Sequence, residues 1–562
     1  MTLAGDTSPR SRQALRFVLT LHSHLPWVLH HGRWPHGSDW ICEAAIDTYL
    51  PLVDMLAALE QEEVPPPLTL GITPILAAQL AHQSFRDELD HYFEHRLKTI
   101  DEAPDSLRQT GDPHLLPLVD FWKYHIESLK ATWERIGKDI NGEFRRHSLA
   151  GRIELISSAA THGFLPLLSR DESIRFQLLV GRSEHMRHFG DLPRGCWVPE
   201  CAYRPTGPWQ PLLSTPRQPV RVGIENHLRY AGFQFFFVDA HVVDAGQTYD
   251  LYSGRIQPLP EATAKRSPYV GYRVGGATRG RPIYALVRDP ATTARVWSRH
   301  EGYPGDGAYL EFHKIRQPGG LKLWRVTSST TDLGAKLPYE PQGARATAAR
   351  HAAHFQSLLD SIDDGAAPGD RAIIAPFDTE LFGHWWFEGM EFLKDLYEDL
   401  SMHTQVQPIT AGDALRADPP DTSLRMSTGS WGKDGNFSMW LNPETEWTWE
   451  RLWGLEARFW NVVPKAMPRW DARPVLEQAA RELLLAQSSD WQFIISTGAA
   501  GDYAIKRFNE HCEALESLLP FLENPSSDLS AGTAIAEGLK IIDGPFPDLI
   551  GAIAAASDVT VA

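Results

Sequence analysis

The chain has 562 residues, of which 43% are hydrophobic and 22% charged, a composition typical of a globular protein with a large core and not of a disordered, collagen-like or coiled-coil chain. Its length corresponds to two or three domains. Lys and Arg number 54 against 71 Asp and Glu, and the net charge of −17 argues against nucleic acid or an anionic membrane surface as a partner.

The N-terminus and the cysteines indicate a reducing compartment. Residues 1–13 are polar and lack the apolar core of a signal peptide, and no window of about 18 apolar residues predicts a membrane span. The cysteines are too few and too scattered for a disulfide framework or a zinc ribbon; they are Cys42, Cys196, Cys201 and Cys512. We therefore expect a cytoplasmic protein.

Seven or eight short apolar runs, each bounded by turn residues, predict strands. The runs are continuously apolar, and stretches of helical periodicity such as 44–59 lie between them, which is typical of a parallel sheet covered by helices. We expect an α/β fold, either a barrel or a doubly wound sheet. The predicted strands are Phe17–Leu21, Leu68–Thr73, Ile153–Ser157, Cys196–Val198, Phe235–Val238, Ile283–Val287, Ala372–Phe377 and Val406–Ile409.

Three stretches depart from this alternation. Residues 84–149 are charged and helical in pattern, without a strand candidate, and predict a helical insertion domain between 1–83 and 150–416. Residues 258–282 are rich in Gly, Pro, Arg and Tyr and predict a long functional loop, such as a lid. From 417 to 545 the chain is Trp-rich and then helical, which predicts an α-helical C-terminal domain followed by a tail over 546–562.

Acids and histidines follow several of the predicted strands, where a parallel barrel places its active site. His22 and His24 follow the first strand on the same side of an extended segment. Glu200 follows the fourth strand and Asp378 the seventh. Two carboxylates about 5–5.5 Å apart form the retaining glycosidase arrangement, with one as nucleophile and the other as proton donor. Taken singly, each acid is also a candidate helix cap.

The same strand ends admit a metal site. His22, His24, Asp239 and His241 together form a candidate zinc-binding cluster, as in a metal-dependent polysaccharide deacetylase on a similar barrel. Two histidines separated by a single residue are a weak metal signature, however, so we favour hydrogen bonding of these histidines to sugar hydroxyls or to carboxylates. A metal assay separates the two interpretations.

The 19 tryptophans exceed what packing requires, and several lie in polar, Gly-rich segments where a flat apolar face suits a sugar ring. Trp431 in a Gly-flanked loop is the best example, whereas Trp449 and Trp453, four apart in a helical stretch, fit a core. A catalytically inactive glucan-binding protein would also carry such surfaces, but it would not need the paired acids. We interpret Glu154 as structural, and the two cysteines beside Glu200 as packing residues.

Five segments in a fixed order resemble the family-57 glycoside hydrolases. They are HSHLP (22–26), ELISSAATHGFLPLL (154–168), GCWVPECAY (195–203), APFDTELFGHWWFEG (375–389) and LLLAQSSDWQF (483–493). Three more resemble the 1,4-α-glucan branching enzymes within that family: VDAHVV (238–243), VWSRHEGYPGDGAYLEF (296–312) and GSWGKDGNFSMWLNPETEW (429–447).

This resemblance implies a (β/α)7 barrel with a helical insertion and an α-helical C-terminal domain that contributes to the cleft. It implies that Glu200 is the nucleophile and Asp378 the general acid/base, that Tyr269 or Tyr272 closes the site as part of a lid, and that no metal or organic cofactor is needed. The implied substrate-binding residues are His22, His24, Trp27, Asp239, His241, Trp431, Trp440, Asp490 and Trp491.

The implied activity is 1,4-α-glucan branching, in which an α-1,4 linkage of an amylose- or glycogen-type glucan is cleaved through a glycosyl-Glu200 intermediate and re-formed as an α-1,6 branch. If the lid does not exclude water, the alternative is an amylase-type hydrolase of the same family. The expected partner is the α-glucan alone, bound by a monomer or small homo-oligomer.

Overall fold

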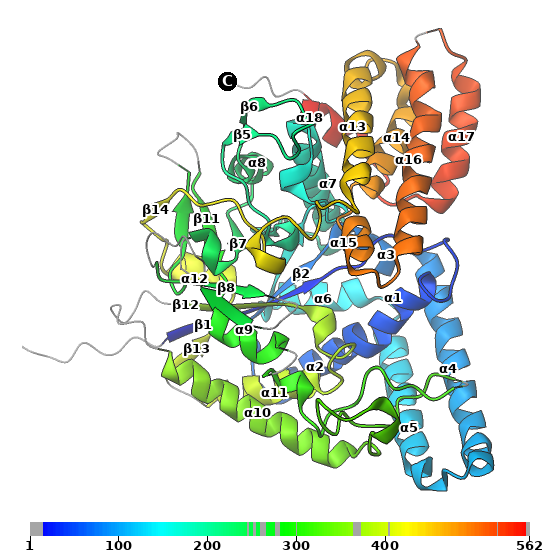
Figure 1. The fold of residues 1–562 in the computed structure, drawn as a ribbon, viewed down its shortest axis with the longest axis vertical. Coiled ribbons are helices and arrows are strands. Elements are labelled where there is room, and N and C mark those ends of the chain that lie inside the picture. Colours follow the sequence, from blue (N-terminus) through cyan, green and yellow to red (C-terminus); the bar gives the residue numbers. More distant parts are fainter. Residues whose placement is uncertain are drawn as a thin grey trace, which may run out of the picture.

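The computed structural model describes residues 15–243, 247–250, 255–258, 266–275, 281–298, 301–317, 319–362, 372–402, 405–524 and 526–557, with the backbone alone at 247–250 and 255–258 (Figure 1). No described helix has an apolar stretch long enough to cross a membrane.

Seven parallel strands form the barrel, in the order β12-β1-β2-β3-β4-β7-β11. A parallel bridge between Arg288, after β11, and Ile374 in β12 brings the two ends of the sheet together. The strands are β1 (Leu15–Ser23), β2 (Leu68–Ile72), β3 (Ile153–Ser158), β4 (Gly195–Trp197), β7 (Phe235–Val238), β11 (Ile283–Val287) and β12 (Ala372–Asp378). The predicted α/β barrel is confirmed.

Further strands extend this sheet or stand beside it. The eighth predicted strand is β13 (Val406–Pro408), which pairs with the start of β1. β10 (Tyr272–Val274) pairs antiparallel with β11 and, on its other edge, parallel with β14 (Ser423–Leu424). Two hairpin-like pairs are formed by β5 (Gly207–Trp209) with β6 (Gln218–Arg221) and by β8 (Gln247–Asp250) with β9 (Arg255–Pro258).

Helices cover the outside of the barrel because its strands are apolar on both faces. In β2 and β3, for example, every residue is buried. The covering elements are α1 (Ser38–Ala44), the π-helix η1 (Ala45–Tyr49), α2 (Leu50–Gln61), α3 (Pro74–Leu80), α7 (Asp171–Phe189), α8 (Ile224–Ala231), α9 (Pro290–Trp297), α10 (Pro341–Ser361), α11 (Gly389–Ser401) and α12 (Ala411–Ala417).

The predicted insertion, residues 84–149, is helical and consists of α4 (Gln83–Thr110), α5 (Leu116–Arg135) and α6 (Ile140–Leu149). α4 and α5 lie antiparallel and project from the barrel at the lower right of Figure 1. They pack through apolar side chains at helical spacing, with the rings of Phe85 and Trp133 5.9 Å apart.

The C-terminal region is a helical bundle at the upper right of Figure 1. It comprises α13 (Glu446–Ala466), α14 (Arg473–Ala486), α15 (Asp490–Thr497), α16 (Gly501–Glu523), α17 (Leu529–Ile542) and α18 (Ile550–Ser557). Residues 550–557, placed in the tail by sequence, form α18, which packs against α7, where Arg175 donates to the Ala556 carbonyl at 2.7 Å. Its apolar sequence, IGAIAAA, explains this docking because the buried face removes apolar surface from water.

The predicted long loop, 258–282, is described over 266–275 and from 281 on, and there it contains β10. Its remaining parts, 259–265 and 276–280, lie outside the described residues. Within the described part the chain adds a strand to the barrel sheet, so this segment is partly regular structure.

Candidate active site

The two predicted catalytic carboxylates stand on opposite sides of the barrel mouth. Asp378 is the last residue of β12, level with His22 of the neighbouring β1. Glu200 lies in the short 3-10 turn η4 (Pro199–Cys201), directly after β4, which is separated from β12 by three strands in one direction and two in the other. The charge of Glu200 contributes to raising the pKa of Asp378, so the two carboxyl groups are near enough for their charges to interact.

Glu200 sits on a tightly constrained turn. Its φ of 60° and the φ of 47° at Cys201 place two consecutive non-glycine residues in the left-handed region. Such backbone costs of the order of 1–3 kcal/mol per residue and persists only where surrounding contacts hold it. Here the amide of Trp431 donates to the Glu200 carbonyl at 3.0 Å. The C-terminal segment therefore fixes the direction in which the Glu200 side chain leaves the backbone.

The Glu200 carboxylate accepts two hydrogen bonds. Trp431 Nε1 donates to Oε2 at 2.8 Å, and Ser489 Oγ donates to Oε1 at 3.2 Å. Burial raises the pKa of Glu200 to about 7, while these two donors oppose the rise and the charge of Asp490 adds to it. Donors to a carboxylate favour its ionised form.

Asp378 has a different environment. Burial raises its pKa well above the ordinary value, and the charges of Glu380 and Glu200 raise it further against the opposing charge of Arg288. Among the described residues, none donates a hydrogen bond to its carboxylate. The surroundings of Asp378 thus favour the protonated acid, whereas the donors at Glu200 support a carboxylate.

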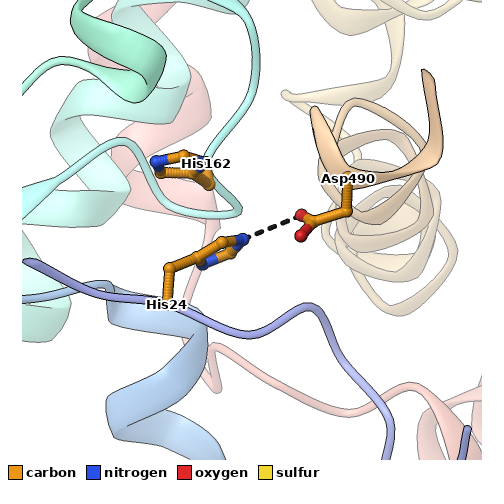
Figure 2. Close-up of side chains that lie close together, drawn as sticks. All are labelled: His24, His162 and Asp490. Atoms are coloured by element: carbon orange, nitrogen blue, oxygen red, sulfur yellow. Dashed lines mark hydrogen bonds and ion pairs between the residues drawn. The ribbon is translucent and has the colours of Figure 1, made fainter. Parts of the chain in front are cut away.

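Three histidine rings lie beside the two acids, since His22 is paired with Asp378 across the sheet and His162 Nδ1 lies 3.7 Å from Glu200 Oε1. His22 and His24 come from the end of β1, and His22 stacks on Trp197 with ring centroids 4.6 Å apart. His24 Nε2 bonds Asp490 Oδ2 at 2.8 Å, and the His24 ring stacks on His162 at 4.1 Å (Figure 2). These contacts join the barrel to the first residue of α15.

His162 was not among the sequence-based candidates. Its Nε2 lies 3.0 Å from His22 Nε2, and its Nδ1 lies 3.0 Å from Ser489 Oγ, the hydroxyl that donates to Glu200. It follows β3 by four residues, so the rule that located the other candidates at strand ends applies to it as well. Its φ of 56° is a further structural sign of a constrained site.

Asp239 and His241 form a separate group after β7. Asp239 is ion-paired with Arg288, and His241 Nε2 bonds the Gly435 carbonyl at 2.8 Å. Arg288 in turn lies 5.6 Å from the centre of the Trp431 ring. These residues therefore support the loop that carries Trp431.

The histidine arrangement does not suit a metal ion. The four residues of the predicted zinc cluster fall into two groups, and the one with Asp239 already contains an arginine. His24, His162 and Asp490 lie close enough to share an ion. However, the two histidine rings are stacked face to face, whereas imidazole nitrogens coordinate in the plane of the ring, and both nitrogens of His162 already have partners.

All four predicted substrate-binding tryptophans are buried, including Trp431, which is 3% exposed. Trp27 donates its indole N–H to the Ile542 carbonyl, Trp491 donates to the Leu485 carbonyl, and Trp440 stacks on Phe164 at 4.5 Å. Trp27, Trp440 and Trp491 are each at most 2% exposed, so their ring faces pack within the protein. Trp431 is the member of the predicted set that contacts a catalytic candidate directly.

The backbone contacts of the two lid candidates lie away from the end of β12 that carries Asp378. Tyr269 accepts a hydrogen bond at its carbonyl from the amide of Ala372, the first residue of β12, whereas Asp378 is the last, roughly 20 Å farther along an extended strand. Tyr272 lies within β10, where it is 4% exposed and donates to the Ser267 carbonyl at 2.8 Å. Pairing of β10 with the barrel sheet, which sequence composition did not reveal, holds Tyr272, whereas the Tyr269 side chain hydrogen-bonds Asp289.

Two family models match this chain and together cover most of it. The model of glycosyl hydrolase family 57 matches residues 18–426, and the model of the 1,4-alpha-glucan branching enzyme C-terminal region matches residues 456–550. A 1,4-alpha-glucan branching enzyme from Thermococcus kodakarensis is 36% identical over 542 residues, which cover 96% of this chain and 78% of that protein.

Solved structures give the same grouping. The crystal structure of a branching enzyme of this family from Thermococcus kodakaraensis matches with a TM-score of 0.87 and 35% identity, over 97% of this chain and 96% of that one. An α-amylase from Thermotoga maritima matches with a TM-score of 0.77 and 26% identity, over 98% and 100% of the two chains.

Proposed function

Because this chain belongs to glycosyl hydrolase family 57, we propose that it uses Glu200 as nucleophile and Asp378 as general acid and base in a 1,4-α-glucan branching reaction. The enzyme cleaves α-1,4 linkages in a glucan and re-forms them as α-1,6 branches. Its similarity to branching enzymes over 96% of the chain and the match of its C-terminal region to theirs support this activity.

The observation that carries the catalytic assignment is the unequal hydrogen bonding of the two acids. Glu200 accepts from Trp431 and Ser489, so its negative charge is stabilised before substrate arrives. Asp378 is half-buried, has no hydrogen-bond donor among the described residues and lies close to other carboxylates, so it holds a proton. A nucleophile and a proton donor need these opposite protonation states in the same site.

In the first half of the reaction, a Glu200 oxygen attacks C1 of the glucosyl unit. The bond between C1 and the glycosidic oxygen breaks, and the Asp378 proton passes to that oxygen, which leaves as a free chain end. The product is a glycosyl ester of Glu200 with inverted configuration at C1, and Asp378 is now a carboxylate.

In the second half, Asp378 accepts the proton of the incoming hydroxyl while that oxygen attacks C1 and releases Glu200. If the hydroxyl is the 6-hydroxyl of a glucan, an α-1,6 branch forms, and if it is water, the glucan is shortened. The similarity to an α-amylase makes hydrolysis the second candidate outcome. Binding of the acceptor and exclusion of water decide between the two.

We also propose a cytoplasmic location, because all four cysteines are buried free thiols. The α-glucan is the partner that this function requires, and we propose that a monomer or small homo-oligomer binds it without a metal or organic cofactor.

The decisive experiment incubates the purified protein with amylose and counts α-1,6 linkages by proton NMR together with new reducing ends. Branches that exceed reducing ends, and that disappear in both Glu200→Gln and Asp378→Asn, support branching by this pair. Reducing ends without branches would make the enzyme a hydrolase. Activity that persists in either variant would overturn the assignment of the pair.

A further inference from the structure

A cavity of about 350 Å³ lies between the helical insertion and the barrel, apart from the catalytic carboxylates. Its volume is at the lower end of the range of small-molecule sites. Residues of α1 and η1, of α4 and α5, and Ile315, Gln317, Gly319, Gly320 and Lys322 line it. The insertion therefore forms one wall of the cavity and the barrel helices form the other.

The cavity is connected to the segment that follows Asp378. Asp47, which lines the cavity, accepts a hydrogen bond from His384 Nδ1 at 3.2 Å. His384 lies six residues after Asp378 in the loop that ends β12. Tyr49 lies in the same helical turn as Asp47, and its hydroxyl donates a hydrogen bond to the Glu380 carboxylate. Glu380 is the second residue after Asp378. The same short stretch of chain thus borders both the catalytic mouth and this cavity.

The cavity offers hydrogen-bonding groups that lack partners. Among the described residues, the carboxylates of Asp39 and Glu43 accept no hydrogen bond and form no ion pair, and the hydroxyl of the half-buried Tyr92 has no hydrogen-bond partner. Arg96, also in the lining, donates to the Gly319 carbonyl through Nη1. Donors and acceptors therefore surround one small volume.

Aromatic rings accompany these polar groups. Trp122 and Tyr92 line the cavity itself. On the catalytic side, Trp385 is 53% exposed and lies against Phe312, with ring centroids 4.6 Å apart. Phe312 also contacts the ammonium of Lys322, another lining residue, at 5.0 Å. A flat, exposed indole beside a polar cavity is a surface on which a sugar ring can stack.

We propose that this cavity and the adjacent Trp385 face form a second glucan-binding site, which holds a segment of α-1,4-linked chain outside the catalytic centre. The inference rests on the proposed function, since a polymer bound at the catalytic mouth extends beyond it. Unpaired carboxylates beside a phenol and a guanidinium match neutral hydroxyls. The lining carries three carboxylates but only two cationic side chains, those of Arg96 and Lys322, and this excess of negative charge disfavours an anionic ligand.

A cation is a poorer match for the same residues. Glu43, Asp47 and His384 lie close enough to share an ion, but the Lys322 ammonium lies 3.3 Å from Asp47 and already supplies the positive charge there. The pKa of Asp47 is low, with Lys322 as the principal charge acting against the effect of burial. A metal ion would have to displace this lysine.

The test uses two sets of variants. Glu43→Gln combined with Tyr92→Phe removes a charge and a hydroxyl with little change in shape, and Trp385→Ala removes the exposed ring. Tyr124→Ala, on the 76%-exposed side chain of α5, is the matched control. In the inactive Glu200→Gln background, titration calorimetry with maltohexaose should show two binding equivalents, of which the cavity variants lose one and the control loses none.

Turnover supplies the second readout. With amylose, the cavity variants should raise KM about fivefold, equivalent to about 1 kcal/mol of lost binding, with kcat unchanged. One equivalent of maltohexaose in all proteins, or an unaltered KM for amylose in the cavity variants, would overturn this inference. If the cavity variants lose one maltohexaose equivalent only in the presence of Ca²⁺ or Zn²⁺, the cavity is a metal site and the inference is overturned. Branching that persists in Glu200→Gln would instead overturn the proposed catalytic function.

Discussion

Two buried groups of histidine and acidic side chains in this molecule differ in how their charges are matched. In the C-terminal bundle, His511 of α16 bonds Glu482 of α14 at 3.0 Å and Arg507 at 2.7 Å. Asp543 is 3.8 Å from His511 and bonds His31 of the barrel at 2.8 Å. Arginine and hydrogen-bond donors accompany the acids, so this group is a balanced network.

At the barrel mouth, carboxylates outnumber their cationic partners. Among the described residues, Glu200, Asp378, Glu380 and Asp490 form no ion pair with lysine or arginine, and the nearby Arg288 is bound to Asp239. Crowded, buried carboxylates have raised pKa values, as Glu200 and Asp378 show. In the bundle, arginines accompany the acids and join the domains, whereas at the mouth no described lysine or arginine pairs with Asp378, whose raised pKa favours the proton that the reaction requires.

The largest expected effect separates the two catalytic roles. Asp378→Asn should lower kcat on amylose by about 10²–10⁴, because protonation of the leaving oxygen is lost. With a maltooligosaccharyl fluoride, whose leaving group needs no proton, formation of the glycosyl enzyme should recover in Asp378→Asn but not in Glu200→Gln. Stopped-flow fluoride release measures this difference. Equal recovery in both variants would contradict the assigned roles.

Breaking the balanced network should destabilise the protein without altering the chemistry. Arg507→Met removes a guanidinium whose charge acts on both Asp543 and Glu482 and should lower the free energy of unfolding by about 3–5 kcal/mol. Urea unfolding monitored by circular dichroism measures the loss, and kcat at 25 °C should be unchanged. Lys506→Met, at the neighbouring exposed position of α16, is the control. A loss no larger than that of the control would show that the network contributes little.

Removing one donor from the unmatched site should shift its pH dependence. Trp431→Phe deletes the indole N–H that stabilises the Glu200 carboxylate. Since a hydrogen bond to a charged group contributes about 1.5–3 kcal/mol, the pKa of Glu200 should rise from about 7 by about 1–2 units. The acidic limb of the kcat/KM profile should move upward accordingly. Trp297→Phe, which keeps this donor, should leave the limb in place.

The smallest effect concerns stability against pH. Burial raises the pKa of Glu200 above its ordinary value of 4.5 to about 7, so the folded state holds the proton more tightly than the unfolded state. Proton binding by Glu200 therefore stabilises the folded state fully below about pH 4.5, and this stabilisation is lost as pH rises through 7. Glu200→Gln should therefore be more stable than wild type by about 1–3 kcal/mol at pH 8 and much less so at pH 5. Equal differences in Tm at both pH values would contradict this.

Sequence patterns predicted the barrel well because a strand buried on both faces must be continuously apolar. Each of the seven barrel strands overlaps a predicted run, from Phe17–Leu21 in β1 to Ala372–Phe377 in β12. The same rule placed Glu200 and Asp378 at strand ends. It did not single out His162, although this residue follows β3 in the same manner.

The sequence by itself determined the α/β barrel, the helical insertion and the positions of the two acids, because periodicity and strand ends are local properties of the chain. Only the tertiary structure decided that Trp431 and Ser489 donate to Glu200 while Asp378 receives no such bond from any residue that the structure describes, and that Trp27, Trp440 and Trp491 face the interior. These contacts join residues hundreds of positions apart. Protonation states depend on burial and on such distant partners, which no local pattern encodes.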